Sequence, residues 1–153
     1  MSRDIKSLRP SKKSRYEQGY VNPLTCKKIF ESQRGIPIIF RSSLEKKFVI
    51  WCESNKDVYR WGSECVQVSY YDPRDERQHI YNPDFFIEMT DGRKIAIEIK
   101  PYNQTIPPKH PVCDDYAWNT YIKNRLKWDA AIRFFEQRGI KFQIITEKFF
   151  KKS

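Results

Sequence analysis

The sequence holds 153 residues, of which 39% are hydrophobic and 31% charged, and its formal net charge at pH 7 is +10. A chain of this length folds most simply as one domain with its own core. It contains no apolar run near the roughly 20 residues that span a membrane, and its basic N-terminus lacks the apolar segment of a secretory signal. We therefore expect a protein that is neither secreted nor inserted in a membrane.

The positive charge is concentrated towards the two ends. Residues 1–40 carry nine basic and three acidic side chains, residues 101–153 carry ten and five, and residues 41–100 carry ten and eleven. Basic flanks around a slightly acidic centre fit a protein that grips a polyanion and holds a cation in the middle. The alternative is a basic protein whose charge runs are only solvated.

Four cysteines and two histidines are present: Cys26, Cys52, Cys65, Cys113, His79 and His110. The cysteines form no C-x-x-C pair, and the histidines do not stand at ligand spacing from them, so a zinc site is not expected. Reduced thiols in a cytoplasmic setting are the simplest interpretation.

The first segment of the chain differs from the rest in composition. Residues 1–22 are polar, basic and poor in apolar side chains, which predicts a tail that stays mobile until it meets a partner. Residues 23–153 are predicted to form the single folded domain. Within the tail, we expect Lys12, Lys13 and Arg15 to contact DNA.

A helix is predicted over residues 43–54, where apolar side chains recur at helical spacing. Ser42 and Glu45 match the capping box that starts many helices, with the glutamate reaching back to the serine. A strand with alternating side chains follows at 66–70, and the polar stretch 72–78 turns the chain towards a β-hairpin.

The hairpin is indicated by two β-rich runs on either side of Asp91 and Gly92. A two-residue loop would put Asp84 and Glu98 on opposite faces, because side chains alternate along a strand. A three-residue loop with Gly92 in the left-handed conformation sets Asp84 opposite Glu98. The other face then collects Phe85, Ile87, Ile95, Ile97 and Ile99. We predict the three-residue loop, since it satisfies both burial and chemistry.

Pro83, Asp84, Glu98 and Lys100 have the spacing of a PD-(D/E)xK nuclease site. Two adjacent carboxylates repel each other unless a cation joins them, and ligation by oxygen alone suits Mg²⁺, with Mn²⁺ as a substitute. The metal would activate a water for attack on phosphorus, with the backbone carbonyl of Ile99 as a further ligand. Lys100 would orient that water or stabilise charge on the phosphate. The alternative is a solvated hairpin face on which acids and bases alternate.

A proline-rich connection follows this site. Within it, Asn103 and Gln104 are predicted at the DNA-facing mouth. A long helix is predicted over about 115–138, ended by Gly139, and a last strand over 140–145.

The long helix carries interleaved basic and aromatic side chains. We expect Lys123 and Lys127 to contact DNA phosphates. An inward-facing apolar side is predicted for Tyr121, Ile122, Leu126, Ala131 and Phe135.

The predicted elements follow the order αβββαβ. By analogy, this is the core of the restriction-endonuclease-like fold, an α/β (α+β) fold with a mixed central sheet flanked by helices. In many nucleases of that fold a glutamate of the first helix supplies a third carboxylate to the metal, and Glu45 occupies that place here. Glu64, at a strand entrance, is a weaker candidate and is expected to be structural.

Five short blocks carry a resemblance to a known family: RSSLE at 41–45, WGSE at 61–64, EIKP at 98–101, KWDAA at 127–131 and RGIKF at 138–142. In this order they resemble the head completion nucleases of T4-like bacteriophages over residues 41–147. The resemblance implies an Mg²⁺-dependent DNA endonuclease that acts on packaged DNA late in head assembly, in the virion and the host-cell cytoplasm. Its implied partners are DNA and portal, capsid or neck proteins, and its implied catalytic residues are Asp84, Glu98, Lys100 and Glu45.

Two other functions remain open. One is a non-catalytic head or portal protein that keeps a nuclease fold for DNA binding. The other is a TnsA-like or junction-resolving nuclease, since the TnsA type shares the Pro83-Asp84 pair but lacks the WGSE and KWDAA blocks.

Overall fold

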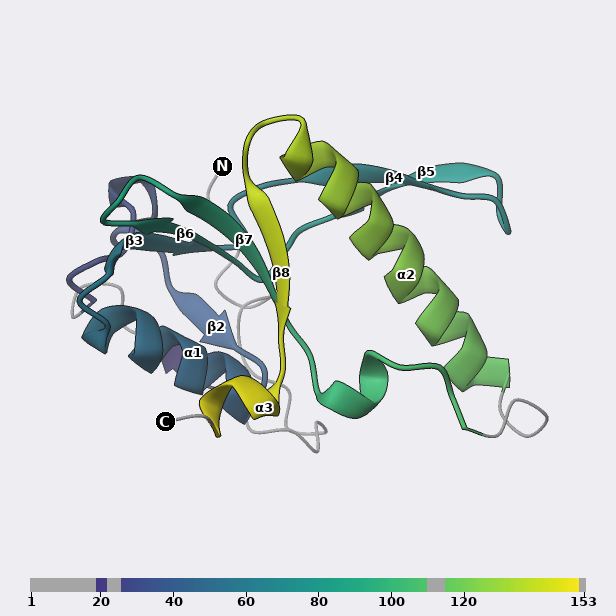
Figure 1. The fold of residues 1–153 in the computed structure, drawn as a ribbon, viewed down its shortest axis with the longest axis horizontal. Coiled ribbons are helices and arrows are strands. Elements are labelled where there is room, and N and C mark those ends of the chain that lie inside the picture. Colours follow the sequence, from purple (N-terminus) through teal and green to yellow (C-terminus); the bar gives the residue numbers. More distant parts are fainter. Residues whose placement is uncertain (1–18, 22–25, 110–114, 152–153) are drawn as a thin grey trace.

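A computed structural model describes residues 19–21, 26–109 and 115–151 (Figure 1). The predicted DNA contacts Lys12, Lys13 and Arg15 lie outside the described residues. At the end of the predicted tail, β1 (Gly19–Val21) pairs antiparallel with β2 (Ile38–Phe40).

A mixed four-stranded sheet forms the centre of the fold. Its strands lie in the order β3 (Val58–Ser63), β6 (Phe85–Met89), β7 (Lys94–Ile99) and β8 (Lys141–Ile145). The β7–β8 pair is parallel and the other two pairs are antiparallel. With α1 (Ser43–Ser54) before the sheet and α2 (Asp115–Glu136) before β8, the predicted αβββαβ order is confirmed.

The hairpin of β6 and β7 has the predicted register. Phe86 pairs with Ala96 and Glu88 with Lys94, and the Met89 N–H donates to the carbonyl of Arg93 at 2.8 Å. Gly92 has a φ of 93°, the left-handed conformation that the three-residue loop requires.

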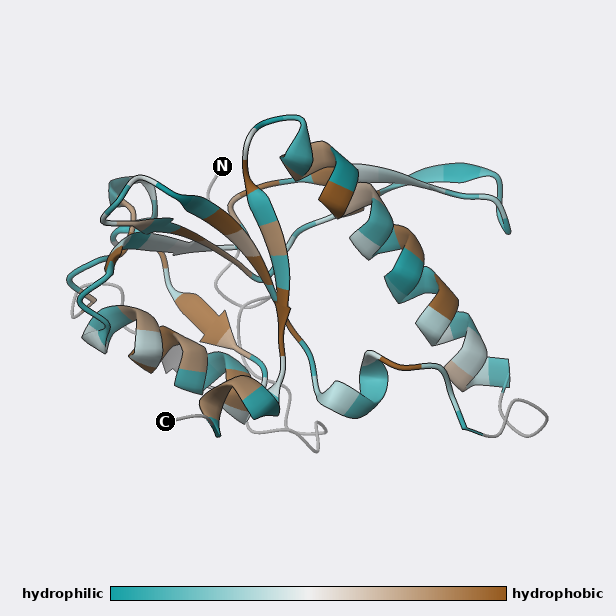
Figure 2. Cartoon of the chain, viewed as in Figure 1, coloured by the Kyte–Doolittle hydropathy of each residue, from teal (hydrophilic) through white to brown (hydrophobic). Residues whose placement is uncertain are grey.

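Each face of the sheet is covered by its own apolar cluster. One cluster joins the sheet to α1: Phe48, Val49, Cys52, Trp61, Phe85, Ile87, Ile97, Ile99 and Ile145. The second joins it to α2: Val68, Tyr70, Tyr81, Ala96, Trp128, Ala131 and Phe135. Hydrophobic residues follow the central strands, whereas the distal end of the β4–β5 hairpin is hydrophilic (Figure 2). Alternation along β6 and β7 therefore turns the apolar stripe towards α1 and the carboxylate face towards α2.

The first core strand differs from the prediction. The strand expected at 66–70 is β4 (Val68–Asp72), which pairs with β5 (Arg77–Tyr81) in a separate two-stranded sheet. The strand that pairs with β6 is β3, which has buried residues at four of its six positions and no alternation. A strand covered on both faces has no period-2 signal, whereas a half-exposed hairpin does.

The long helix ends near its predicted end. Gly139 has a φ of 70°, and the N–H of Ile140 donates to the carbonyl of Phe135 at 2.9 Å, as in a glycine-terminated helix. Ala131 and Phe135 face inward as predicted, but the prediction for Ile122 is wrong because this side chain is 38% exposed. A short helix that was not predicted, α3 (Glu147–Phe150), follows β8.

None of the described helices has the length and apolar character needed to cross a membrane. Cys26 and Cys52 are buried and Cys65 is exposed, and all three are free thiols.

Candidate active site

The strand ends bring the two predicted carboxylates together. Asp84 immediately precedes β6, and Glu98 is the fifth residue of β7. The Asp84 carboxylate accepts a hydrogen bond from the N–H of Ile99 at 2.7 Å, which ties it to the neighbouring strand. The carbonyl of Asp84 accepts from the N–H of Glu64 at 3.0 Å. Backbone groups on both sides therefore hold Asp84 in place.

Glu98 is buried against α2, with 5% of its surface exposed. Its Oε2 accepts a hydrogen bond from the indole Nε1 of Trp128 at 3.1 Å, and Trp128 itself is fully buried. Trp128 belongs to the apolar cluster on the α2 side of the sheet, and its contact with Glu98 was not predicted from the sequence. The only signal was the KWDAA block, because an inward aromatic on a helix looks like any other core residue.

The electrostatics of the site favour a bound cation. The pKa of Asp84 is raised well above its ordinary value, first by burial and then by the negative charges of Glu98 and Glu45. The N–H of Ile99 opposes this shift only in part. Gathering carboxylates in a buried site is unfavourable without a positive partner, and oxygen donors of this kind suit hard divalent ions.

Tyr81, at the end of β5, lies against the same carboxylates. Burial and the charges of Glu98 and Asp84 raise the pKa of its hydroxyl, which keeps it protonated. The hydroxyl is buried, and no hydrogen-bond geometry joins it to any described residue. A buried hydroxyl beside a carboxylate can become a second donor to Glu98 after a small rotation.

Glu45 lies in the first turn of α1, but its side chain does not complete the predicted capping box. The Ser42 hydroxyl does accept from the N–H of Glu45, at 3.2 Å. The Glu45 carboxylate instead accepts from the backbone N–H of Arg41. Burial raises the pKa of Glu45, with the charges of Glu64 and Glu98 adding to the shift. Glu45 is therefore part of the acidic cluster.

A cavity of about 10 Å³, the size of one water molecule, lies within this cluster. Its lining residues are Ile39, Arg41, Glu45, Ser63, Glu64, Asp84 and Phe85. Glu64 has a φ of 49°, which is uncommon for a residue with a side chain, and its carboxylate lies 3.3 Å from the Arg41 guanidinium. Strained backbone of this kind often occurs at functional sites. Glu64 thus lies beside Asp84, and the structural role expected for it stays a prediction.

The WGSE block has a physical basis in its packing. Trp61 donates from its indole nitrogen to Glu53 at 2.7 Å. A Cβ at Gly62 would lie 2.5 Å from the ring of Phe30, so only glycine fits there. The Gln33 amide accepts from the N–H of Ser63 at 2.8 Å and donates to its carbonyl at 2.6 Å. These contacts fix the end of β3 that delivers Glu64.

Two lysines lie on elements that flank the carboxylates. Lys100 follows β7, and its N–H donates to the carbonyl of Ile145 at 3.0 Å. Lys127, on α2, is half-buried, and its pKa is lowered by burial and by Lys123 and Lys100, while Glu98 and Asp84 oppose this shift. Its predicted contact with a DNA phosphate, like that of Lys123, stays a prediction.

Asn103 and Gln104 lie on the 3₁₀ turn η3 (Tyr102–Gln104), which begins two residues after Lys100. Asn103 is exposed and Gln104 is half-buried. Neither side chain has a hydrogen bond to a carboxylate of the site among the described residues. Their predicted contact with DNA stays a prediction.

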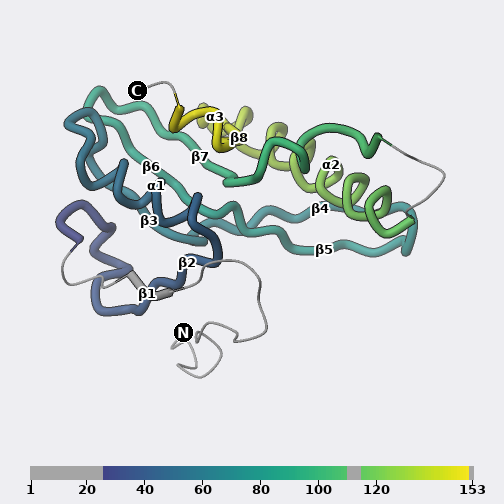
Figure 3. Tube along the Cα trace, turned by 90° about the horizontal axis from the view of Figure 1, so that it is seen from below, coloured from purple at the N-terminus to yellow at the C-terminus, as the bar shows by residue number. Residues whose placement is uncertain are grey.

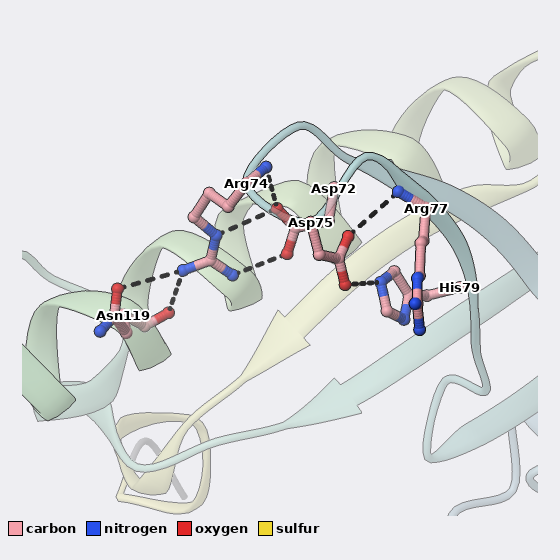
Figure 4. Close-up of polar contacts among 6 residues, drawn as sticks. All are labelled: Asp72, Arg74, Asp75, Arg77, His79 and Asn119. Carbon is pink, nitrogen blue, oxygen red and sulfur yellow. Dashed lines mark hydrogen bonds and ion pairs between the residues drawn. The ribbon is translucent and has the colours of Figure 1, made fainter.

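A separate acidic group lies at the β4–β5 turn. Ligand atoms of Asp72, Asp75 and His79 lie within 4.8 Å of one another. Arg74 occupies both oxygens of Asp72, and His79 lies 2.7 Å from Asp75 (Figure 4). This group is already satisfied by internal bonds.

Comparison with known proteins adds two findings. The family described as TnsA-like endonuclease N terminal matches residues 55–147, well over half of the chain and including Asp84, Glu98 and Lys100. The head completion nuclease of Enterobacteria phage T4 is 35% identical over 127 residues, which cover 74% of this chain and 83% of that protein. The family match begins after Glu45.

Proposed function

The chain belongs to the TnsA-like endonuclease family and is related to a phage head completion nuclease, and from this premise we propose that it is an Mg²⁺-dependent DNA endonuclease. The observation that carries the proposal is the buried carboxylate pair. Asp84 and Glu98 meet at the ends of paired strands, and their charges oppose each other without a cation. Structural acids seldom share a buried site, because the repulsion serves no purpose there.

Each side chain has a distinct role in this proposal. Asp84, Glu98 and the Ile99 carbonyl would hold the ion, with Glu45 as a further carboxylate. When bound, such an ion neutralises the phosphate and lowers the pKa of a bound water. The Ile99 N–H orients Asp84, and the Trp128 indole orients Glu98. Lys100 stabilises the charge that develops on the phosphate oxygens.

We also propose that the protein acts in phage head completion. The support is the relative of that name, whose likeness extends over most of both chains. The substrate is then packaged DNA, and the partners are portal, capsid or neck proteins. The protein would be found in the virion and in the host cytoplasm.

The test is cleavage of linear duplex, single-stranded and branched DNA in Mg²⁺, with EDTA as the metal-free arm. Asp84→Asn keeps the side-chain volume but removes the charge, so cleavage is expected to fall at least a hundredfold. DNA binding is expected to persist or to tighten, since a repelling carboxylate is removed. A preference for branched DNA would favour the junction-resolving alternative over trimming of DNA ends.

Glu88→Gln is the matched control. Glu88 lies on the same hairpin face, paired with Lys94 rather than with the acidic cluster, and should keep its activity. Cleavage that survives EDTA or Asp84→Asn contradicts the proposed active site. Absence of cleavage, even with portal proteins added, supports the structural head-protein alternative.

A further inference from the structure

A larger cavity lies between α2 and the turn that joins β4 to β5. The strand β4 packs along α2, so the hairpin and the helix lie side by side (Figures 1 and 3). Its volume of about 380 Å³ is within the size range of ligand sites. The lining residues are Arg74, Tyr116, Asn119, Thr120, Lys123, Asn124 and Lys127. All but Arg74 lie on α2 at spacings that put them on one side of the helix.

Arg74 fixes the far wall of this cavity. Its guanidinium donates to both oxygens of Asp72, at 3.0 and 2.8 Å, and to the backbone carbonyl of Asn119 at 3.1 Å (Figure 4). Asp72 therefore balances the charge of Arg74, whose role is to hold the hairpin against α2. Lys123 and Lys127 form no ion pair with a described residue, although the charges of Glu98 and Asp84 act on Lys127, whose Nζ lies 5.6 Å from the centroid of the Tyr81 ring.

Asn124 adds a polar group to the wall of the cavity. The residue is 6% exposed, and its side-chain amide forms no hydrogen bond with the residues that the structure describes and is open to the cavity. The amide offers both donors and an acceptor to a molecule in the cavity.

The two ends of the cavity differ in character. Tyr116 is 80% exposed at one end. At the other, Lys127 lies near Glu98 and Asp84, whose charges act on it. Eleven residues of helix separate Tyr116 from Lys127, about 16 Å at 1.5 Å per residue. The lining residues on α2 therefore extend from the exposed ring of Tyr116 through Lys123 to Lys127, beside the candidate active site.

We propose that this groove binds one unpaired DNA strand and leads it to Asp84 and Glu98. The proposal rests on the proposed nuclease function and specifies the form of its substrate. Cations that follow a backbone, combined with an exposed aromatic ring, are the usual means of binding single strands. Lys123 and Lys127 contact phosphates, the Asn124 amide hydrogen-bonds to the strand, and a base stacks on Tyr116. The bases of an intact duplex are already stacked and leave Tyr116 without a partner.

The experiment measures the fluorescence anisotropy of a labelled 12-nucleotide oligo(dT), and of a duplex of equal length, with the full chain in EDTA. The variants are Lys123→Ala and Tyr116→Leu, both at exposed positions. The control is Arg133→Ala, which removes one positive charge from an exposed position of α2 outside the cavity.

Tyr116→Leu should weaken oligo(dT) binding roughly fivefold or more. Lys123→Ala should lower the slope of log affinity against log salt by about 0.7, the value for one phosphate on a single strand. Arg133→Ala should match the unmodified chain. Duplex binding should be weaker and insensitive to Tyr116→Leu.

Two results overturn the groove proposal. One is that Lys123→Ala and Arg133→Ala change oligo(dT) binding equally. The other is that the duplex binds as tightly as oligo(dT) and that Tyr116→Leu weakens the binding of both equally. A parallel cleavage assay in Mg²⁺ separates the two proposals. If oligo(dT) binding depends on Lys123 and Tyr116 but no DNA is cleaved, even with portal proteins added, the groove proposal is supported and the nuclease proposal is contradicted. If DNA is cleaved but oligo(dT) binding does not depend on these residues, the nuclease proposal is supported and the groove proposal is contradicted.

Discussion

At the scale of single residues, the contact between Trp128 and Glu98 decides how the site is held. Glu98 is buried, and the indole is its one hydrogen-bond donor among the described residues. Groups that orient a metal ligand commonly change metal affinity or activity by about 10- to 100-fold when removed. In the proposed active site, Trp128 is therefore a positioning residue.

Trp128→Phe keeps an aromatic ring but removes the N–H. We expect the Mg²⁺ concentration for half-maximal cleavage to rise about tenfold, with activity recovered at high Mg²⁺. Trp118→Phe is the control, because the Trp118 indole nitrogen is buried without a partner among the described residues. Equal Mg²⁺ titrations of the two variants, with both folded by circular dichroism, would contradict the positioning role.

Candidate site residues could be named from the sequence only where their spacing matches a known motif. Asp84, Glu98 and Lys100 follow from a motif whose geometry depends on one hairpin register. Trp128 and Tyr81, which lie against Glu98, come from elements outside the hairpin, and no local pattern distinguishes them from core residues. The direction of the Glu45 side chain depended on a competition between two backbone N–H groups, of Ser42 and Arg41, that local sequence does not resolve.

At the scale of elements, glycine is required at two positions for different reasons: Gly92 in the β6–β7 loop and Gly62 near the end of β3. Gly92 has a left-handed backbone, and a Cβ there would have no heavy atom within 4 Å. Gly62 has no such backbone, but a Cβ there would lie 2.5 Å from Phe30. One glycine is required by conformation and the other by close packing.

Gly92→Ala should lower the free energy of unfolding by about 1–2 kcal/mol, the cost of a left-handed residue with a side chain. Gly62→Ala should lower it by about 1–3 kcal/mol through overpacking. Adding Phe30→Leu should recover part of the stability at Gly62 and none at Gly92, as measured by urea unfolding. Recovery in both double variants, or in neither, would refute the assignment of causes.

The same scale explains which elements could be predicted. The β6–β7 register followed from a turn signal and an apolar stripe that agree with each other. β3 was missed because Trp61, Gly62 and Ser63 are all buried and show no alternation. The clear alternation of β4 correctly predicted a strand. It did not predict the sheet to which that strand belongs, since pairing depends on contacts that a single strand does not specify.

At the scale of the whole molecule, the charge distribution predicts how DNA affinity depends on salt. Residues 1–18 carry six basic and two acidic side chains, and they precede β1. If they contact phosphates, they contribute counterion release to binding.

Deleting residues 1–18 should weaken duplex binding and reduce the salt slope by about 0.9 for each phosphate that the protein no longer neutralises. Replacing Lys12, Lys13 and Arg15 together by Gln tests charge at constant length, and should reproduce much of the effect. The measurement is affinity between 50 and 200 mM salt, a range within which such neutralisation has large effects. An unchanged slope in both variants would rule out a DNA role for this segment.

The parallel pairing of β7 with β8 also determines how much of the chain must be synthesised before the candidate site can form. Glu98 and Lys100 lie on a strand whose neighbour is residues 141–145, and the indole that orients Glu98 arrives with residue 128. A nascent chain that ends at Lys100 contains Glu45, Asp84 and Glu98 but neither β8 nor Trp128. Contacts of such long sequence separation form late. In the proposed nuclease, the site is therefore complete only when almost the whole chain has been synthesised, so a chain that ends before residue 128 is expected to leave DNA uncut.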